Sequence, residues 1–213
     1  EAGKYNVLPI DSRGVVRIAD ERPQIAASRS RYVLYPGTQS ISAASAPKIL
    51  NRPYSINAEV DLTEESAGVL LSMGGNDGGI TFYVKNGLLC YAHNYVAKEV
   101  FTARSADRVP TGRHFLSVEF APSGPPDIKN GKGTPGTVTL FVDGTEIGRG
   151  EFPVTTPIRL AQGGAMLVGA DTGSSVTPHY DPRFRFDGRI HRVIVDVSGE
   201  AFALPSLGVW AAA

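Results

Sequence analysis

Alternation of apolar and polar residues constrains this chain more than any other feature. In YSINAEVDL, residues 54–62, every second side chain is apolar and those between are polar. A strand with one buried and one exposed face produces this period of two. Asn86-Gly87 and Asp143-Gly144 each separate two apolar runs, and both dipeptides favour the two-residue turn of a β-hairpin. The pattern therefore predicts antiparallel strands joined by tight turns.

Short apolar runs recur along the rest of the chain, most of them separated by turns that contain Gly or Pro. They are GVLLSM, ITFYVK, LLCYAHNYV, EVFTAR, HFLSVEF, TVTLFV, EIGRGEF, MLVGA and RIHRVIVDV. No window of helical length repeats every 3.6 residues without a Pro or Gly in it. About nine or ten short strands at regular spacing predict an all-β fold, a two-sheet antiparallel sandwich of the jelly-roll kind.

Three regions are expected along the chain. Residues 1–53 are irregular and rich in Pro and Arg, and we interpret them as an N-terminal arm; residues 54–200 form the β-sandwich domain and residues 201–213 a C-terminal tail. The arm contains the apolar cluster YNVLPI, in which Pro9 argues against a long helix or a central strand. We expect this cluster and the nearby arginines to pack against a partner surface.

Charge and cysteine content exclude several classes of function. The chain carries 21 basic and 21 acidic side chains, and this balance argues against nucleic acid or an anionic membrane as the main partner. A single cysteine, Cys90, excludes an internal disulfide and a CxxC metal site. No apolar run is long enough to span a bilayer. The chain opens EAGKYNVLP without Met, which indicates a fragment or a processed product.

Several segments together resemble a known family. They are KYNVLPIDSR, YPGTQSI, NRPYSINAEV, GVLLSMGGNDGGITFYVKNGLLCYAHNY, GTVTLFVDG, VGADTGSSV and FRFDGRIHRVIVDV. In them the chain resembles the C-terminal region of large bacterial arylsulfatases, where a concanavalin A-like (laminin-G-like) sandwich follows the catalytic domain. The resemblance spans about residues 1–197, and the shared segments are structural in character.

The resemblance implies an accessory role. It suggests a non-catalytic domain that docks on and supports the catalytic domain of the same polypeptide, in the bacterial cytoplasm or periplasm. That parent, a sulfuric ester hydrolase, would use formylglycine, made in a C-x-P-x-R or S-x-P-x-R motif, and a divalent cation. Neither motif occurs here: Cys90 is followed by Ala92 and Asn94 where Pro and Arg are required. We expect no catalytic residue and no cofactor of its own in this chain, which should be inactive alone.

A carbohydrate-binding module is the first alternative, because sandwiches of this class often bind sugars. Such a module requires an exposed aromatic platform, and Tyr91, Tyr95 and Phe101 are the candidates. Its ligand would be a carbohydrate or a sulfated compound. Inference from fold to function is analogy in either case.

A glycoside hydrolase is the second alternative, and it rests on EVDLTE. Glu59 and Asp61 share one face of a strand, and a bulge can turn Glu64 towards them. Retaining hydrolysis needs two carboxyl groups roughly 5–5.5 Å apart. We favour a simpler interpretation, with Glu59 and Asp61 on the solvent face and Glu64 in the following turn. Sugar clefts are commonly built with tryptophan, and the one tryptophan here is Trp210.

Calcium is the metal for which the sequence offers ligands. Asp171, Asp181 and Asp187 lie in and after the loop ADTGSSVTPHYDP and could supply hard oxygen atoms. The favoured alternative is that Asp171 and Thr172 accept hydrogen bonds from turn amides. Calcium takes 6–8 oxygen ligands, and only these carboxylates are visible in the sequence.

The four histidines show no metal-binding spacing, so we expect structural roles for them. They are His93, His114, His179 and His191.

Overall fold

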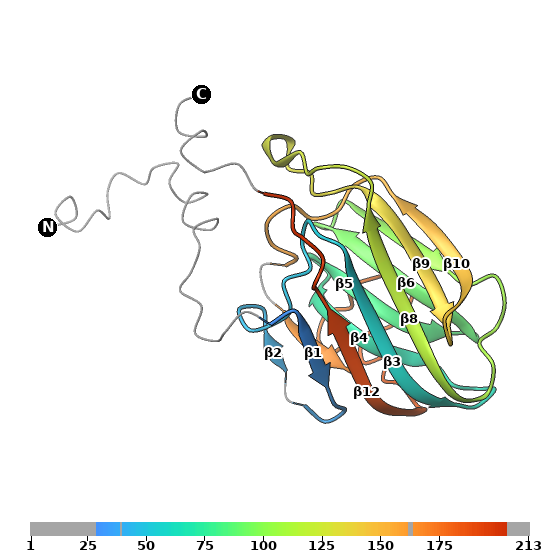
Figure 1. The fold of residues 1–213 in the computed structure, drawn as a ribbon. Coiled ribbons are helices and arrows are strands. Elements are labelled where there is room, and N and C mark those ends of the chain that lie inside the picture. The colour runs from blue at the N-terminus through green and yellow to red at the C-terminus, as the bar shows by residue number, and fades with distance from the viewer. Residues whose placement is uncertain (1–28, 39, 162–163, 204–213) are drawn as a thin grey trace, which may run out of the picture. The chain divides into compact units, whose positions relative to one another are not determined.

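The computed structural model describes residues 29–38, 40–161 and 164–203, which form two antiparallel sheets of six strands each (Figure 1). Sheet A contains, in spatial order, β1 (Arg31–Leu34), β12 (Arg189–Asp196), β3 (Tyr54–Leu62), β8 (Gly112–Pro122), β9 (Gly136–Val142) and β10 (Thr145–Phe152). Sheet B contains β2 (Ile41–Ser42), β11 (Ala165–Val168), β4 (Gly68–Gly75), β5 (Gly78–Lys85), β6 (Leu88–Tyr95) and β7 (Glu99–Arg104). The two-sheet, all-β prediction is confirmed.

Helix is almost absent from the described ranges. They contain one short 3-10 helix, η1 (Ile128–Asn130), in the polar connection between β8 and β9. None of the helical structure in these ranges has the length and apolar character that a bilayer crossing requires.

Strand β3 shows how the alternating sequence produces a half-buried strand. Its residues alternate between buried and partly exposed from one end to the other, as the sequence predicts. It lies in the middle of sheet A, paired with β12 on one side and β8 on the other. Ile56 and Val60 are fully enclosed. Enclosing a side chain of this size stabilises the fold by roughly 1.5–3 kcal/mol.

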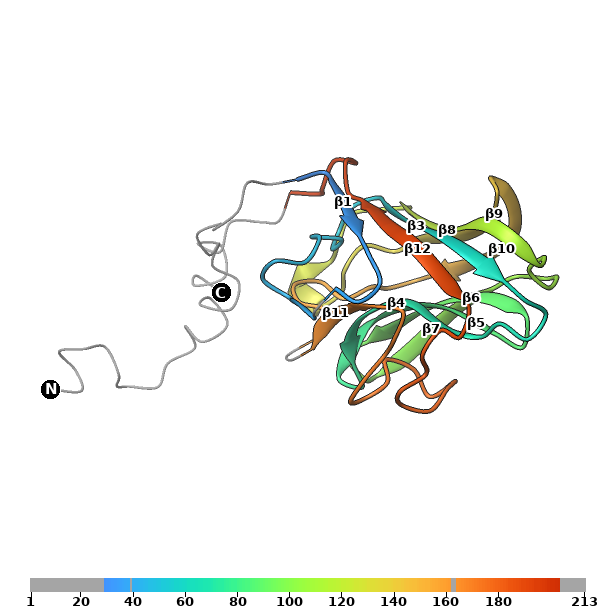
Figure 2. The same ribbon diagram turned by 90° about the horizontal axis from the view of Figure 1, so that it is seen from below.

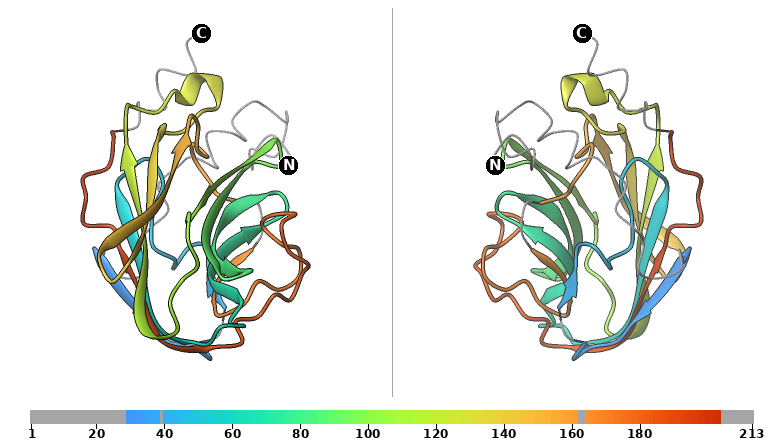
Figure 3. Two further views of the ribbon diagram at one scale, coloured as in Figure 1. Left: turned by 90° about the vertical axis from the view of Figure 1, so that its right-hand side faces the viewer. Right: turned by 90° about the vertical axis from the view of Figure 1, so that its left-hand side faces the viewer.

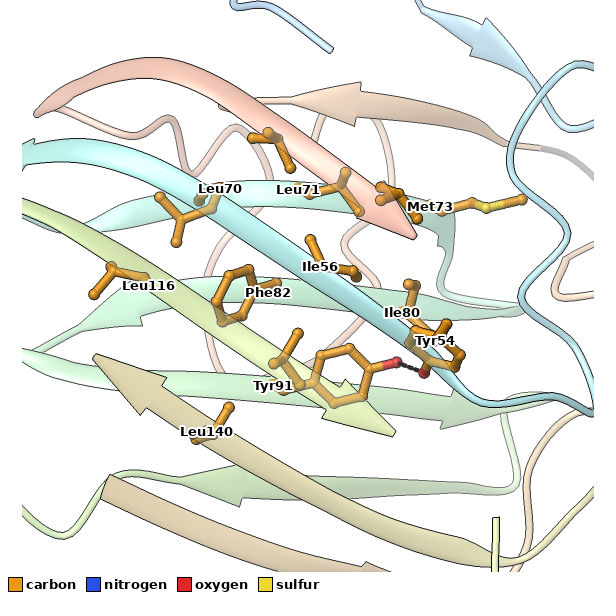
Figure 4. Packing of buried hydrophobic residues seen from close by; sticks show 14 of the residues in the cluster. Tyr54, Ile56, Leu70, Leu71, Met73, Ile80, Phe82, Tyr91, Leu116 and Leu140 are labelled. Carbon is orange, nitrogen blue, oxygen red and sulfur yellow. Dashed lines mark hydrogen bonds between the residues drawn. The ribbon is translucent and has the colours of Figure 1, made fainter. Parts of the chain in front are cut away.

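Aliphatic and aromatic side chains from both sheets fill the space between them (Figure 4). Phe82 and Tyr91 come from sheet B, and Ile56 and Leu116 come from sheet A. The hydroxyl groups of Tyr54 and Tyr91 lie 2.5 Å apart and hydrogen-bond to each other inside this layer. Each hydroxyl thus satisfies the other, which removes the penalty of an unpaired buried polar group.

The two predicted hairpins are present. Asn86 and Gly87 join β5 to β6 with φ values of 52° and 74°, and Asp143 and Gly144 join β9 to β10 with 49° and 81°. Two successive residues with positive φ define the type I′ turn, whose twist matches that of the flanking strands. Asn, Asp and Gly adopt this backbone at low cost, which is why these dipeptides predict it.

The N-terminal boundary differs from the sequence interpretation. Within residues 1–53, interpreted as an arm, β1 pairs with β12 at one edge of sheet A, and β2 pairs with β11 at one edge of sheet B. These strands have four and two residues, too few to show a period of two. The cluster YNVLPI and most of the expected C-terminal tail lie outside the described residues.

A long connection between β11 and β12, residues 169–188, covers the outer face of sheet B (Figures 2 and 3). Tyr180 and Phe184 of this connection pack on Val69, Tyr83 and Cys90, forming a second, smaller apolar cluster. The outer face of β4, β5 and β6 is therefore buried, which explains their nearly continuous burial. The open sheet face of this domain belongs to sheet A.

Candidate functional site

An open depression lies at the edge of sheet A where β12 begins. It has a volume of about 500 Å³ and is lined by Tyr35, Pro36, Gly188, Arg189, Ile190 and His191. We call it the Tyr35 depression. Its walls come from the turn after β1 and from the first residues of β12, which are distant in sequence.

The unequal length of β1 and β12 creates this depression. β1 ends at Leu34, which pairs with Val193, so β12 has no β1 partner over residues 189–192. Beyond Leu34 the chain turns: the Thr38 N–H donates to the Tyr35 carbonyl oxygen at 3.2 Å, and Gly37 has a φ of 80°. Pro followed by Gly at the two central positions is typical of a type II turn. The turn places Tyr35 beside the uncovered half of β12.

Tyr35 has the most exposed large side chain among the apolar residues at its edge of the sheet. It is 56% exposed, although tyrosine normally hides much of its ring. Arg189, on the opposite wall, is also exposed. The depression thus combines an aromatic ring with hydrogen-bond donors from the start of β12.

A β-bulge positions His191 in the depression. The register between β12 and β3 shifts between Ile190 and Arg192, so His191 is the extra residue. Its Nε2 lies 2.8 Å from Asp61 Oδ2, and the imidazole N–H donates to that carboxylate. The side chain of His191 is 19% exposed. Asp61 therefore holds the ring in one orientation while part of it still contacts solvent.

Glu59, on the same face, is held by two arginines. Arg113 Nη2 lies 2.7 Å from Glu59 Oε1, and Arg192 Nε lies 2.8 Å from Glu59 Oε2. Loss of hydration opposes ionisation of this carboxyl, but the hydrogen bond and charge of Arg113, with those of Arg192, outweigh it and lower the pKa of Glu59. A carboxylate engaged on both oxygens and kept ionised is unsuited to act as a general acid.

The expected arrangement of the three acidic residues of EVDLTE is confirmed. Glu59 and Asp61 lie on the outer face of β3, each paired with basic side chains. Glu64 is exposed in the turn between β3 and β4, and its carbonyl oxygen accepts a hydrogen bond from Arg108. The structure thus leaves each of these carboxyl groups in a structural or solvated position.

The aromatic platform expected from sheet B is not formed. Tyr91 is fully buried in the core, and Phe101 packs against the same core. Tyr95 donates its hydroxyl proton to the Gly131 carbonyl oxygen at 2.8 Å, which ties its ring to a neighbouring loop. Sequence reasoning named these residues without assigning their faces, and Tyr91 and Phe101 belong to the core between the two sheets. Sequence reasoning missed Tyr35, whose signal was an aromatic residue directly before the turn sequence PGT.

The three calcium candidates have separate environments. Asp171 is 1% exposed and accepts hydrogen bonds from the Tyr180 hydroxyl at 2.6 Å and from the Val176 N–H at 3.0 Å. Asp187 accepts from the Ala67 N–H at 2.8 Å, and Asp181 is exposed. Within the described ranges no three metal-ligating side chains are grouped as a cation site. Asp171 satisfies loop donors, as the favoured alternative predicts, and calcium binding stays a prediction.

The histidines have different surroundings. His93 is buried and accepts a hydrogen bond from the Thr156 N–H on Nε2 at 3.1 Å; burial lowers its pKa to about 4. His114 lies at a hairpin end, where its hydrogen bond to Asp143 raises its pKa. Burial, together with the nearby charge of Arg104, lowers the pKa of His179.

The fold defines the class of this domain: it is an all-β, two-sheet antiparallel sandwich of the jelly-roll kind. No family model and no curated protein matches the chain. Among solved structures it is similar to the carbohydrate-binding module CBM40 of a Ruminococcus gnavus sialidase, bound to α2,6-sialyllactose, with a TM-score of 0.51 and 17% identity. This match covers 81% of the chain and 93% of the module.

Two further matches have lower TM-scores. Mouse laminin α1 domains LG4-5 match with a TM-score of 0.45 and 17% identity, over 82% of this chain and 46% of that one. A pentraxin of Limulus polyphemus matches with a TM-score of 0.43 and 13% identity, over 79% of this chain and 77% of that one. At such identities the likeness extends to the fold alone.

Proposed function

We propose that this chain is a non-catalytic carbohydrate-binding domain whose ligand occupies the Tyr35 depression. The observation that carries the proposal is the exposed ring of Tyr35 beside Arg189 and the His191–Asp61 pair. Sugar sites combine an apolar surface with a few oriented polar groups, and this depression has both. The similarity to a carbohydrate-binding module supports the class of ligand.

Each group has a definite role in this proposal. The Tyr35 ring stacks on the C–H face of a sugar ring, and its hydroxyl remains free for hydrogen bonding. Arg189 donates hydrogen bonds to sugar oxygens, His191 Nδ1 accepts one from a sugar hydroxyl, and Asp61 keeps the imidazole fixed. Because His191 and Tyr35 are held by a bulge and a turn, little ordering is required on binding.

A glycan array followed by titration calorimetry tests the proposal. Tyr35→Ala should weaken binding of the selected oligosaccharides at least tenfold, about 1.4 kcal/mol, while Tyr35→Phe retains most of the affinity. Phe115→Ala is the matched control, since Phe115 is 45% exposed on β8 of the same sheet but does not line the depression. Equal affinities of Tyr35→Ala and the unmodified chain, or absence of binding to any glycan, would refute the proposal.

An accessory role in an arylsulfatase is a second proposal, supported by the sequence resemblance alone. In it the domain supports a catalytic domain of the same polypeptide, and carbohydrate binding by the Tyr35 depression would serve to recruit substrate. The coding sequence upstream of Glu1 tests it. A formylglycine motif in the same reading frame would support the role, and an unrelated upstream sequence would remove it.

A further inference from the structure

The connection that leads from sheet B into β12 carries a row of exposed arginines. Its sequence RFRFDGR, residues 183–189, alternates Arg with Phe, and Val69 of β4 forms an isolated parallel bridge with Arg185. The chain turns at the start of this segment, where Arg183 has a φ of 74° and its carbonyl oxygen accepts a hydrogen bond from the Arg185 N–H at 2.7 Å. Phe184 packs against the small cluster on sheet B and Phe186 against the main core, and the three arginines of the segment are exposed to solvent. We call Arg183, Arg185 and Arg189 the basic strip.

The three guanidinium groups of the basic strip are unpaired. Across the described residues, none of them takes part in a side-chain hydrogen bond or an ion pair. Nearby carboxylates are engaged elsewhere: Asp61 lies opposite Arg189 in the strand register but binds His191, and Asp187 binds the Ala67 N–H. Asp181 is exposed two residues before Arg183 and offsets part of the charge.

Two other arginines of the domain show how a guanidinium group pairs when a carboxylate lies within reach. Arg192, three residues after the strip, and Arg113 both bind the Glu59 carboxylate at hydrogen-bond distance. Guanidinium groups pair with carboxylates and with sulfate groups through fixed, planar sets of donors. The basic strip presents the same donors, and no carboxylate among the described residues binds them.

The basic strip and the Tyr35 depression share one residue. Arg189 lines the depression and is also the last arginine of the strip, so the two features adjoin at this residue. The aromatic ring of Tyr35 favours a sugar over a simple anion as the ligand. The arginines of the basic strip favour a ligand in which neighbouring sugars also carry acidic groups. Zero net charge over the whole chain argues against a nucleic acid, which is usually bound by a strongly basic surface.

We infer that the ligand is an acidic polysaccharide, with one sugar ring on Tyr35 and the carboxylate or sulfate groups of this and adjoining sugars on Arg189, Arg185 and Arg183. The inference rests on the proposed function and adds the ligand class. It requires the chain to bind a charged oligosaccharide more tightly than a neutral one of equal length, with an affinity that falls as salt increases.

Calorimetry with four probes tests the inference. They are octasaccharides of hyaluronan, which carries carboxylates, of heparin, which also carries sulfates, and of neutral cellulose-type sugar, and a single-stranded DNA of matched charge. The triple variant Arg183→Gln, Arg185→Gln, Arg189→Gln should lose about tenfold or more in affinity for the charged sugars and show a shallower dependence on salt. Comparison of hyaluronan with heparin identifies the preferred anionic group.

Controls separate the inference from the proposed function. The variant Lys98→Gln, Lys129→Gln, Lys132→Gln removes three exposed cations elsewhere and should bind as the unmodified chain does. Tyr35→Ala should weaken binding of the charged sugars as well, which a purely electrostatic surface would not show. Binding of the neutral sugar with equal affinity, unaffected in the double variant Arg183→Gln, Arg185→Gln, would overturn the inference and leave the proposed function intact, because this variant keeps Arg189 of the depression. Equal binding of DNA, or no binding of any sugar, would also overturn it, and the second result would remove the proposed function too.

Discussion

His93 should make the domain less stable in acid, and the structure sets the size of the effect. Its Nε2 accepts a hydrogen bond from the Thr156 backbone N–H, so the neutral ring carries its proton on Nδ1. Protonation of Nε2 would break this bond and place a charge in a site that is 3% exposed. Burial accordingly lowers the pKa of His93 from 6.5 to about 4.

The direction in which stability changes with pH follows from proton binding by the folded and unfolded chains. Between pH 6.5 and about 4 the unfolded chain binds a proton at this position and the folded chain does not. The stabilising contribution is therefore complete above pH 6.5 and is lost as the pH falls towards 4. A pKa lowered from 6.5 to about 4 corresponds to about 3 kcal/mol, a large fraction of the free energy of unfolding of an ordinary domain.

Urea unfolding at several pH values measures this effect. His93→Gln keeps an acceptor for the Thr156 N–H but cannot titrate, so its stability should depend less on pH between 6.5 and 4. His114→Gln is a control of opposite sign, because the hydrogen bond to Asp143 raises the pKa of His114 and its contribution is lost as the pH rises. Parallel pH curves for His93→Gln and the unmodified chain would refute the reasoning.

Three further predictions concern loops. Val96 has a φ of 45°, a left-handed backbone that costs a β-branched residue about 1–2 kcal/mol. Val96→Gly should therefore raise the free energy of unfolding, measured by urea titration, by about 1 kcal/mol. A lower free energy of unfolding would contradict this prediction. Asp171→Ala should lower the free energy of unfolding by about 1–3 kcal/mol, since the buried Val176 N–H loses its acceptor while the Tyr180 hydroxyl can still donate to Thr81 Oγ1, and Tyr180→Phe should cost about 1 kcal/mol. If Asp171, Asp181 and Asp187 bind calcium, added calcium should raise the melting temperature relative to chelator, and an unchanged temperature would remove the metal proposal.

The sequence by itself determined most of the strands, though not β1 and β2, and the buried face of those that alternate clearly. Alternation in YSINAEVDL predicted the buried and exposed sides of β3, and Asn86-Gly87 and Asp143-Gly144 predicted two hairpins at their correct places. It also predicted that Glu59 and Asp61 would lie on the solvent face. These properties depend on residues close together in the chain, because a strand's alternation and a turn's backbone are local.

Only the tertiary structure decided which strands are neighbours and therefore where the candidate site lies. β1 and β12 come from opposite ends of the described chain, and the Tyr35 depression exists because β1 ends at Leu34 while β12 extends further. Packing of the two sheets against each other likewise removed the candidate aromatic platform, because Tyr91 and Phe101 belong to the core between them. Periodicity identifies the apolar face of a segment but not what covers it, since long-range pairing depends on packing between strands distant in sequence.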